Sequence, residues 1–326
     1  MKTLIKSALA GATIAGALTF MSGTASALEI KAADVHGPGY PTVAAMEYMG
    51  ELLSDWTDGR ITVTVYGNMQ LGGEKEYLEQ AQLGALEIAR VSNGVIGPLV
   101  DDFNAFNLPY VFRGVDHMHK VLDGPIGQDL LQKLEGSGLI ALGYMDAGSR
   151  SFYNDVRPIN SISDLDGLKI RVMQNPAFVE MVNAMGGNGI PYPFNELYTG
   201  LQTRVVDGAE NNPPTYLSKN HFEVAKYYTL TEHLMVPEVF VFSKVIWDTL
   251  PEEDQKLIRK AGQMAAVKQR ELWAAKETEA LEKLKADGYE IVMEIDKTDF
   301  INATAGVRQK FGSQYSDMIE AISAVE

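Results

Sequence analysis

The stretch GLKIRVMQNP, residues 167–176, indicates the fold class of this chain. Its apolar residues alternate with Lys169 and Arg171, which is the pattern of a β-strand with one buried face. The Asn-Pro pair that follows is typical of a helix start, with Asn at the N-cap and Pro at the first helical position. Arg171 is therefore expected near the carboxyl end of a strand, the edge of an open α/β sheet at which ligands bind.

On both sides of this stretch, strand and helix patterns alternate, which predicts an α/β fold. One helical segment is unusually long, since it begins at Pro251, has acidic residues in its first turn and meets few breakers before Gly288. At 3.6 residues per turn it would have about ten turns, enough to brace two lobes against each other. A mature chain of about 300 residues is also large enough to divide into two lobes.

The N-terminus has the three parts of a secretory signal peptide. Basic residues lie within residues 1–6, small and apolar residues fill 8–21, and Ala-Ser-Ala at 25–27 is typical of a cleavage site. We therefore predict that residues 1–27 are a signal peptide and that the mature chain, from Leu28, is exported to the periplasm. No cysteine follows the cleavage site, which argues against a lipoprotein, and no later stretch reads as a membrane span.

The charge balance argues against nucleic acid as a partner. The chain has 43 Asp and Glu residues against 28 Lys and Arg residues, a formal net charge of −15. A protein this acidic is a poor binder of nucleic acid, and an anionic ligand would need a local, preformed positive site. The sequence has no cysteine, so no disulfide stabilises it in an oxidising compartment.

Motifs typical of enzymes are missing from the sequence. It has no thiol nucleophile, no G-x-S-x-G elbow, no H-E-x-x-H zinc motif and no phosphate-binding G-x-x-x-x-G-K loop. His117 and His119 are two positions apart, a spacing that does not place both on one face of a helix. We therefore expect no catalytic residue, no metal and no cofactor.

Three arginines near predicted strand ends are candidate ligand contacts: Arg90, Arg150 and Arg171. Arginine is the side chain that binds a planar carboxylate through two parallel hydrogen bonds. For any one of them, the alternative is a surface ion pair in an acidic protein. The segment AENNPPTY, residues 209–216, places Asn211 and a second amide beside a rigid Pro pair, suited either to a ligand or to a structural turn.

Four motifs, in order along the chain, resemble those of the periplasmic solute-binding subunits of tripartite ATP-independent periplasmic (TRAP) transporters, the DctP-like family. They are QLGGEKEYLEQAQLGALEIARVS, NLPYVF, GLKIRVMQNP and ELYTGLQTRVVDGAENNPPTY. The resemblance implies a periplasmic-binding-protein-like clamshell of two α/β lobes with mixed sheets, joined by crossing strands and the long helix. We expect lobe I to comprise residues 28–147 and 236–275, and lobe II to comprise residues 148–235 and 276–326.

The resemblance also implies how a ligand is held. The arginine at the position of Arg171 would pair with the carboxylate of an organic acid. Arg150 would be a second contact, and Asn211 would support both the ligand and the carboxylate-binding arginine. The closed, loaded form would then dock on the membrane permease subunits of a TRAP transporter.

The segments ADVHGPGYPTVAAM, LGGEKE and ARVSN look like those of family members that bind hexuronates. A hexuronate such as D-glucuronate or D-galacturonate has one carboxylate and a ring of hydroxyls, which need both donors and acceptors. Glu74 would repel a second carboxylate and so favours a sugar acid over a C4-dicarboxylate. The further residues expected at the ligand are His36, Glu74, Arg90, Asn93 and Tyr216.

Several alternatives stay open on the sequence alone. Glu74 could cap the helix that follows Gly73, and His36 could be a loop histidine bonded to backbone. The ligand could be a C4-dicarboxylate or another small organic acid. The chain could also be an exported hydrolase or lyase on a two-lobed scaffold, or a sensor accessory that presents its ligand to a receptor.

Overall fold

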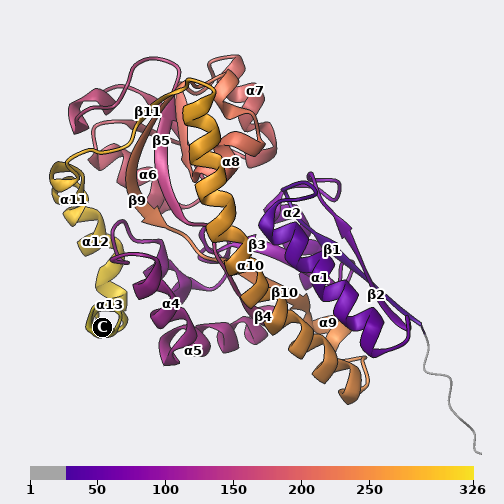
Figure 1. The fold of residues 1–326 in the computed structure, drawn as a ribbon. Coiled ribbons are helices and arrows are strands. Elements are labelled where there is room, and N and C mark those ends of the chain that lie inside the picture. The colour runs from indigo at the N-terminus through magenta and orange to yellow at the C-terminus, as the bar shows by residue number, and fades with distance from the viewer. Residues whose placement is uncertain (1–26) are drawn as a thin grey trace, which may run out of the picture.

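The computed structural model describes residues 27–326. Within them the strands form two sheets, one in each half of the molecule, with helices packed around both (Figure 1). The predicted signal peptide, residues 1–27, lies outside the described residues except for its last residue. No helix in this range combines the length and the apolarity that a membrane span requires.

Both sheets are mixed, because each contains parallel and antiparallel neighbours. The first sheet consists, in spatial order, of β2 (Ile61–Tyr66), β1 (Leu28–Ala33), β3 (Ile88–Ser92), β10 (Glu238–Ser243) and β4 (Leu139–Met145). The second consists of β11 (Glu290–Val292), β9 (Tyr227–Met235), β5 (Ser149–Asn154), β8 (Gly208–Asn211), β6 (Lys169–Val172) and β7 (Asn188–Pro191). β10 is antiparallel to β3 and β4, and β5 is antiparallel to β8 and β9.

Helices cover the sheets and connect their strands. They are α1 (Pro41–Trp56), α2 (Glu74–Gln82), α3 (Asn93–Ile96), α4 (Val115–Asp123), α5 (Pro125–Lys133), α6 (Pro176–Ala184), α7 (Leu197–Gln202), α8 (Pro213–Ser218), α9 (Lys244–Trp247), α10 (Glu252–Ala286), α11 (Thr298–Ala303), α12 (Ala305–Gly312) and α13 (Ser316–Ala324). The order of strands and helices confirms the predicted α/β class.

Strand β10 shows how the first sheet is buried on both faces. Val239 and Val241 point into one apolar cluster, whereas Phe240 and Phe242 point into a second cluster on the opposite face. This is the consequence of the two-residue period of a strand. The sheet is therefore a rigid layer, and side chains at its strand ends are held in fixed positions.

The long helix expected from the sequence is α10, which has 35 residues. It begins after Pro251 and has Glu252, Glu253 and Asp254 in its first turn, where the helix dipole favours negative charge. Figure 1 shows α10 running along the molecule, and it packs against α1 and β4 in one half and against α8 in the other. It therefore connects the two halves.

The chain also crosses between the sheets from β4 to β5 and from β9 to β10. The C-terminal helices extend over both halves, since α12 packs against α6 and α13 packs against α5. The boundaries of the two lobes given above remain a prediction.

The stretch GLKIRVMQNP folds as its sequence predicts. Arg171 is the third residue of β6, and α6 begins at Pro176. The side chain of Asn175 caps this helix by accepting a hydrogen bond from the backbone N–H of Ala177 at 2.9 Å. The predicted strand and N-cap are therefore confirmed, but burial does not alternate along β6, because Arg171 is buried together with Ile170 and Val172.

The segment AENNPPTY is a junction between strand and helix, not a plain turn. Strand β8 ends at Asn211, and Asn212 caps α8 by accepting a hydrogen bond from the backbone N–H of Thr215 at 2.8 Å. The two adjacent amides therefore have different positions, and Asn211 lies at the C-terminal end of β8, an interior strand of the second sheet.

Candidate functional site

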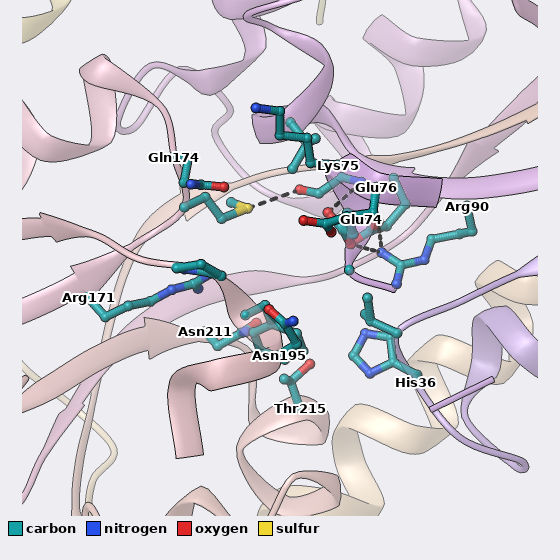
Figure 2. Close-up of a pocket in the computed structure, with 18 of the residues that line it drawn as sticks. His36, Glu74, Lys75, Glu76, Arg90, Arg171, Gln174, Asn195, Asn211 and Thr215 are labelled. Carbon is teal, nitrogen blue, oxygen red and sulfur yellow. Dashed lines mark hydrogen bonds and ion pairs between the residues drawn. The ribbon is translucent and has the colours of Figure 1, made fainter. Parts of the chain in front are cut away.

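A cavity lies between the two halves and has residues of both in its walls. Figure 2 shows Arg171 and Arg90 approaching this cavity from opposite sides. Six of the eight residues predicted from the sequence line it, namely His36, Glu74, Arg90, Arg150, Arg171 and Asn211. Their role in ligand binding stays a prediction, but the fold brings these six together.

Arg171 is a buried cation, and no carboxylate within the described residues pairs with it. Its residue is 3% exposed, and its Nε donates a hydrogen bond to the carbonyl oxygen of Tyr192 at 2.8 Å. The guanidinium carbon lies 5.5 Å from the centre of the Phe194 ring. Among residues 27–326 it forms no ion pair, and neither Nη atom has a hydrogen-bond partner. Burial lowers the pKa of Arg171 to about 10, so the guanidinium remains charged at neutral pH and lacks a counter-ion.

Arg150, by contrast, is already engaged by the protein. Its Nε and Nη2 donate to the carboxylate of Glu210 at 2.5 and 2.8 Å, and its Nη1 donates to Oδ1 of Asn211 at 3.0 Å. Burial alone would raise the pKa of Glu210, but Arg150 and His233 hold it at about 2. The charge of Arg150 is therefore neutralised within the second half.

Arg90 forms ion pairs with three carboxylates on the other side of the cavity. Its Nη2 donates to Asp34 at 2.7 Å, and its Nη1 donates to Glu74 at 2.5 Å and to Glu238. Glu74 also accepts a hydrogen bond from the backbone N–H of Ser92 at 3.3 Å, so its carboxylate does not cap its own helix. Lys219 lies near this cluster, since its Nζ donates to the carbonyl oxygen of Val35 at 2.6 Å, so three carboxylates face two cations and this end of the cavity is acidic.

His36 contributes a neutral imidazole to the same end. Its ring stacks on Tyr40 at a centroid distance of 3.6 Å and meets the edge of Phe194 at 6.2 Å. Burial, and next the charge of Arg90, lower the pKa of His36 well below its usual value, so the ring is uncharged at neutral pH. Its Nδ1 is buried and has no hydrogen-bond partner among the described residues, so the ring is not fixed by backbone.

Asn93 and Tyr216 are not among the residues that line the cavity, so the fold does not bring these two predicted residues together with the other six. The Nδ2 of Asn93 donates to the carbonyl oxygen of Phe103 and to Oδ1 of Asn107, both at 2.9 Å. Tyr216 is completely buried, stacks on Tyr228 and donates its hydroxyl to a backbone carbonyl oxygen. Both residues satisfy their polar atoms within the fold.

Sequence reasoning missed several polar residues in the cavity walls: Lys75, Glu76, Gln174, Asn195, Thr215 and Glu238. Lys75 and Glu76 belong to the LGGEKE segment, Gln174 to GLKIRVMQNP and Thr215 to AENNPPTY. These residues could therefore have been predicted from their positions within motifs already assigned to the site. Nothing in the sequence around Glu238 marks it in the same way.

The family model described as bacterial extracellular solute-binding protein, family 7 (DctP), matches residues 32–314. The chain belongs to the DctP family. Members of this family are the solute-binding proteins of TRAP transporters, so the resemblance seen in the sequence is confirmed and the chain is not an enzyme.

Solved structures of other TRAP solute-binding proteins share the fold of this DctP protein. The protein of Pseudomonas putida F1 with bound D-glucuronate is 50% identical, with a TM-score of 0.89 and coverage of 92% of this chain and 98% of that chain. The protein of Xanthobacter autotrophicus Py2 with bound β-D-galacturonate is 40% identical, with a TM-score of 0.87 and coverage of 91% and 100%. A solute-binding protein of Chromohalobacter salexigens is 36% identical, with coverage of 94% of this chain and 91% of its own length.

The cavity of this DctP protein has chemically different ends. One end presents the unpaired guanidinium of Arg171, which suits a carboxylate. The other presents the acceptor oxygens of Glu74 and Glu238 and the uncharged ring of His36, which suit hydroxyls. Within the described range no group of three or more His, Asp or Glu residues is arranged to hold a metal ion.

Proposed function

We propose that this chain is the periplasmic solute-binding subunit of a TRAP transporter and that it captures a hexuronate, D-glucuronate or D-galacturonate. The observation that carries the proposal is the buried guanidinium of Arg171, which has no carboxylate partner among residues 27–326. A buried charge is stable only when it is paired, so the cavity is completed by an anion. The ligand carboxylate supplies it.

The acidic end of the cavity argues for a ligand with a single carboxylate. A C4-dicarboxylate would place its second carboxylate toward Asp34, Glu74 and Glu238, which share the one guanidinium of Arg90. Carboxylates that are close together in a buried site repel each other strongly. Sugar hydroxyls, in contrast, are uncharged and can both donate and accept hydrogen bonds at this end of the cavity. The hexuronates bound by the relatives from Pseudomonas putida F1 and Xanthobacter autotrophicus Py2 have this composition.

In this proposal the protein works by capture and delivery. The signal peptide at residues 1–27 directs export to the periplasm, where the mature chain binds its ligand. Arg171 pairs with the carboxylate, Arg150 and Asn211 support that end, and Glu74, Arg90 and His36 contact the hydroxyls. The closed complex then delivers the acid to the membrane permease subunits of the transporter.

The ligand class is tested by calorimetry and thermal unfolding with D-glucuronate, D-galacturonate, succinate and malate. A ligand that binds only the native state adds about 2.7 kcal/mol of stability at about 100 times its Kd. We expect one or both uronates to raise the melting temperature, with no effect of succinate or malate. Stabilisation by succinate or malate, without stabilisation by either uronate, would overturn the proposal in favour of a C4-dicarboxylate binder.

A further inference from the structure

Two carboxylates at the acidic end of the cavity share one nitrogen atom. Oε1 of Glu74 accepts a hydrogen bond from Nη1 of Arg90 at 2.5 Å, and Oε2 of Glu238 accepts from the same Nη1. The two side chains come from α2 and β10, which are far apart in the sequence. Two carboxylates held this close in a buried place bind a proton more readily than either would alone.

Glu238 is the one of the two that is placed to hold this proton. The residue is 7% exposed, lines the cavity and has no hydrogen-bond partner for Oε1 within residues 27–326. Asp34, the third carboxylate on Arg90, is fully engaged, since it also accepts from the hydroxyl of Thr42 at 2.6 Å and from the backbone N–H of His36 at 2.8 Å. Of the three carboxylates on Arg90, Glu238 is therefore the one that is deeply buried, lines the cavity and has an oxygen without a hydrogen-bond partner within residues 27–326.

Within the described residues, no cation near Glu238 is paired with it alone. The charged and titratable groups that act on it come from five elements or their flanks and are Arg90, Glu74, Asp34, Arg150, Tyr40 and Tyr77. Of the two cations, Arg90 is shared by three carboxylates and Arg150 is bound to Glu210. Burial raises the pKa of Glu238 to about 7, and the negative charges of Glu74 and Asp34 act in the same direction. The positive charge of Arg90 opposes this rise.

We propose that Glu238 is a specificity residue that takes up a proton from solvent when the hexuronate binds and donates it in a hydrogen bond from Oε1 to a ligand hydroxyl. The hexuronate in this inference rests on the function proposed above. Binding displaces water from the cavity and brings in an anion, and both changes favour the neutral carboxyl. Ligand binding is then linked to pH, although the uronate carboxylate itself stays ionised near neutrality.

Calorimetry of D-glucuronate in buffers of low and high ionisation enthalpy, such as phosphate and Tris, measures the linked proton directly. We expect the heat of binding of the full mature chain to differ between the two buffers near neutral pH, in the direction of proton uptake. We also expect Kd to rise with pH above about 7, by at most about tenfold per pH unit, the limit for one linked proton. Equal heats in both buffers together with a Kd independent of pH would refute the inference.

Variants assign the proton to its site. Glu238→Gln should bind with no proton uptake and with a Kd that does not change with pH, whereas Glu252→Gln, at an exposed ion pair on α10, should behave as the wild type does. Glu74→Gln removes the neighbouring negative charge, so the rise in Kd should begin at a lower pH. This variant tests the coupling of Glu74 and Glu238 even where Glu238→Gln does not fold. Proton uptake that persists in Glu238→Gln would refute the assignment. Failure of both uronates to bind at any pH would refute the proposed function instead.

Discussion

Replacing Arg171 with alanine should remove most of the ligand affinity and leave the fold intact. In the complex, the ligand carboxylate would lose its counter-ion inside a closed cavity. Neither of the other two arginines can replace it, because Arg150 is bound to Glu210 and Arg90 is shared by three carboxylates. Leaving one partner of a buried charge pair unpaired costs about 3–5 kcal/mol. This corresponds to a Kd that is roughly 150- to 5,000-fold weaker.

The ligand-free protein should respond differently to the same change. Arg171 makes no ion pair among the described residues, and burial lowers its pKa, so its charge costs stability in the absence of ligand. We therefore expect the melting temperature of ligand-free Arg171→Ala to equal or exceed that of the wild type. Titration calorimetry with D-glucuronate and thermal unfolding measure the two effects, and Arg204→Ala, whose side chain is 77% exposed, serves as the control. A variant that binds within about tenfold of the wild type, well short of the loss a buried pair predicts, would refute the reasoning.

Three further predictions concern stability. Arg90→Met leaves three carboxylates without their cation and should lower the free energy of unfolding by about 3–5 kcal/mol, measured by urea denaturation; an unchanged midpoint would contradict this. Burial raises the pKa of Glu277 from 4.5 to about 7, so the native state holds more protons than the unfolded chain between these values. Glu277→Gln should therefore change stability little at pH 5 but raise it by about 1–3 kcal/mol at pH 8, and equal effects at both pH values would speak against it. Tyr216→Phe should cost about 1 kcal/mol through the lost hydrogen bond and leave the uronate Kd within about twofold, since its hydroxyl is bonded away from the cavity.

Local sequence patterns predicted the elements that position the site. Residues 167–176 were sufficient for β6 and for the start of α6, because an alternating apolar pattern and an N-cap depend on neighbours in the chain. The same holds for α10, whose proline, acidic first turn and lack of breakers are all readable in order. For this reason, the strand end that carries Arg171 could be located before the fold was known. The burial of Arg171 itself did not follow from the alternating pattern, which predicts an exposed face for the charged residues.

The charge state of the site could not be predicted in this way. The three arginines near strand ends look alike in the sequence, but their ion pairs differ. Arg90 binds three carboxylates, Arg150 is paired with Glu210, and Arg171 has no ion pair among the described residues. These differences depend on residues far along the chain, since Glu238 lies 148 positions from Arg90 and Glu210 lies 60 positions from Arg150. The position of the Asn93 side chain could not be predicted for a related reason, because it donates a hydrogen bond to Asn107 in the core and does not line the cavity.

The unpaired charge of Arg171 also explains how recognition and closure are linked in the proposed function. The two halves meet around the cavity through neutral or backbone contacts, such as the hydrogen bond between the hydroxyls of Tyr40 and Thr215 at 2.8 Å. Closing over an empty cavity buries the guanidinium without a counter-ion, which disfavours the closed state. An anionic ligand removes that cost and so binds the closed state more tightly than the open one, as a population shift requires. A neutral sugar of the same shape could form the hydroxyl contacts but would leave the guanidinium unpaired. Selectivity for an acid therefore follows from the energetics of closure as well as from the direct ion pair.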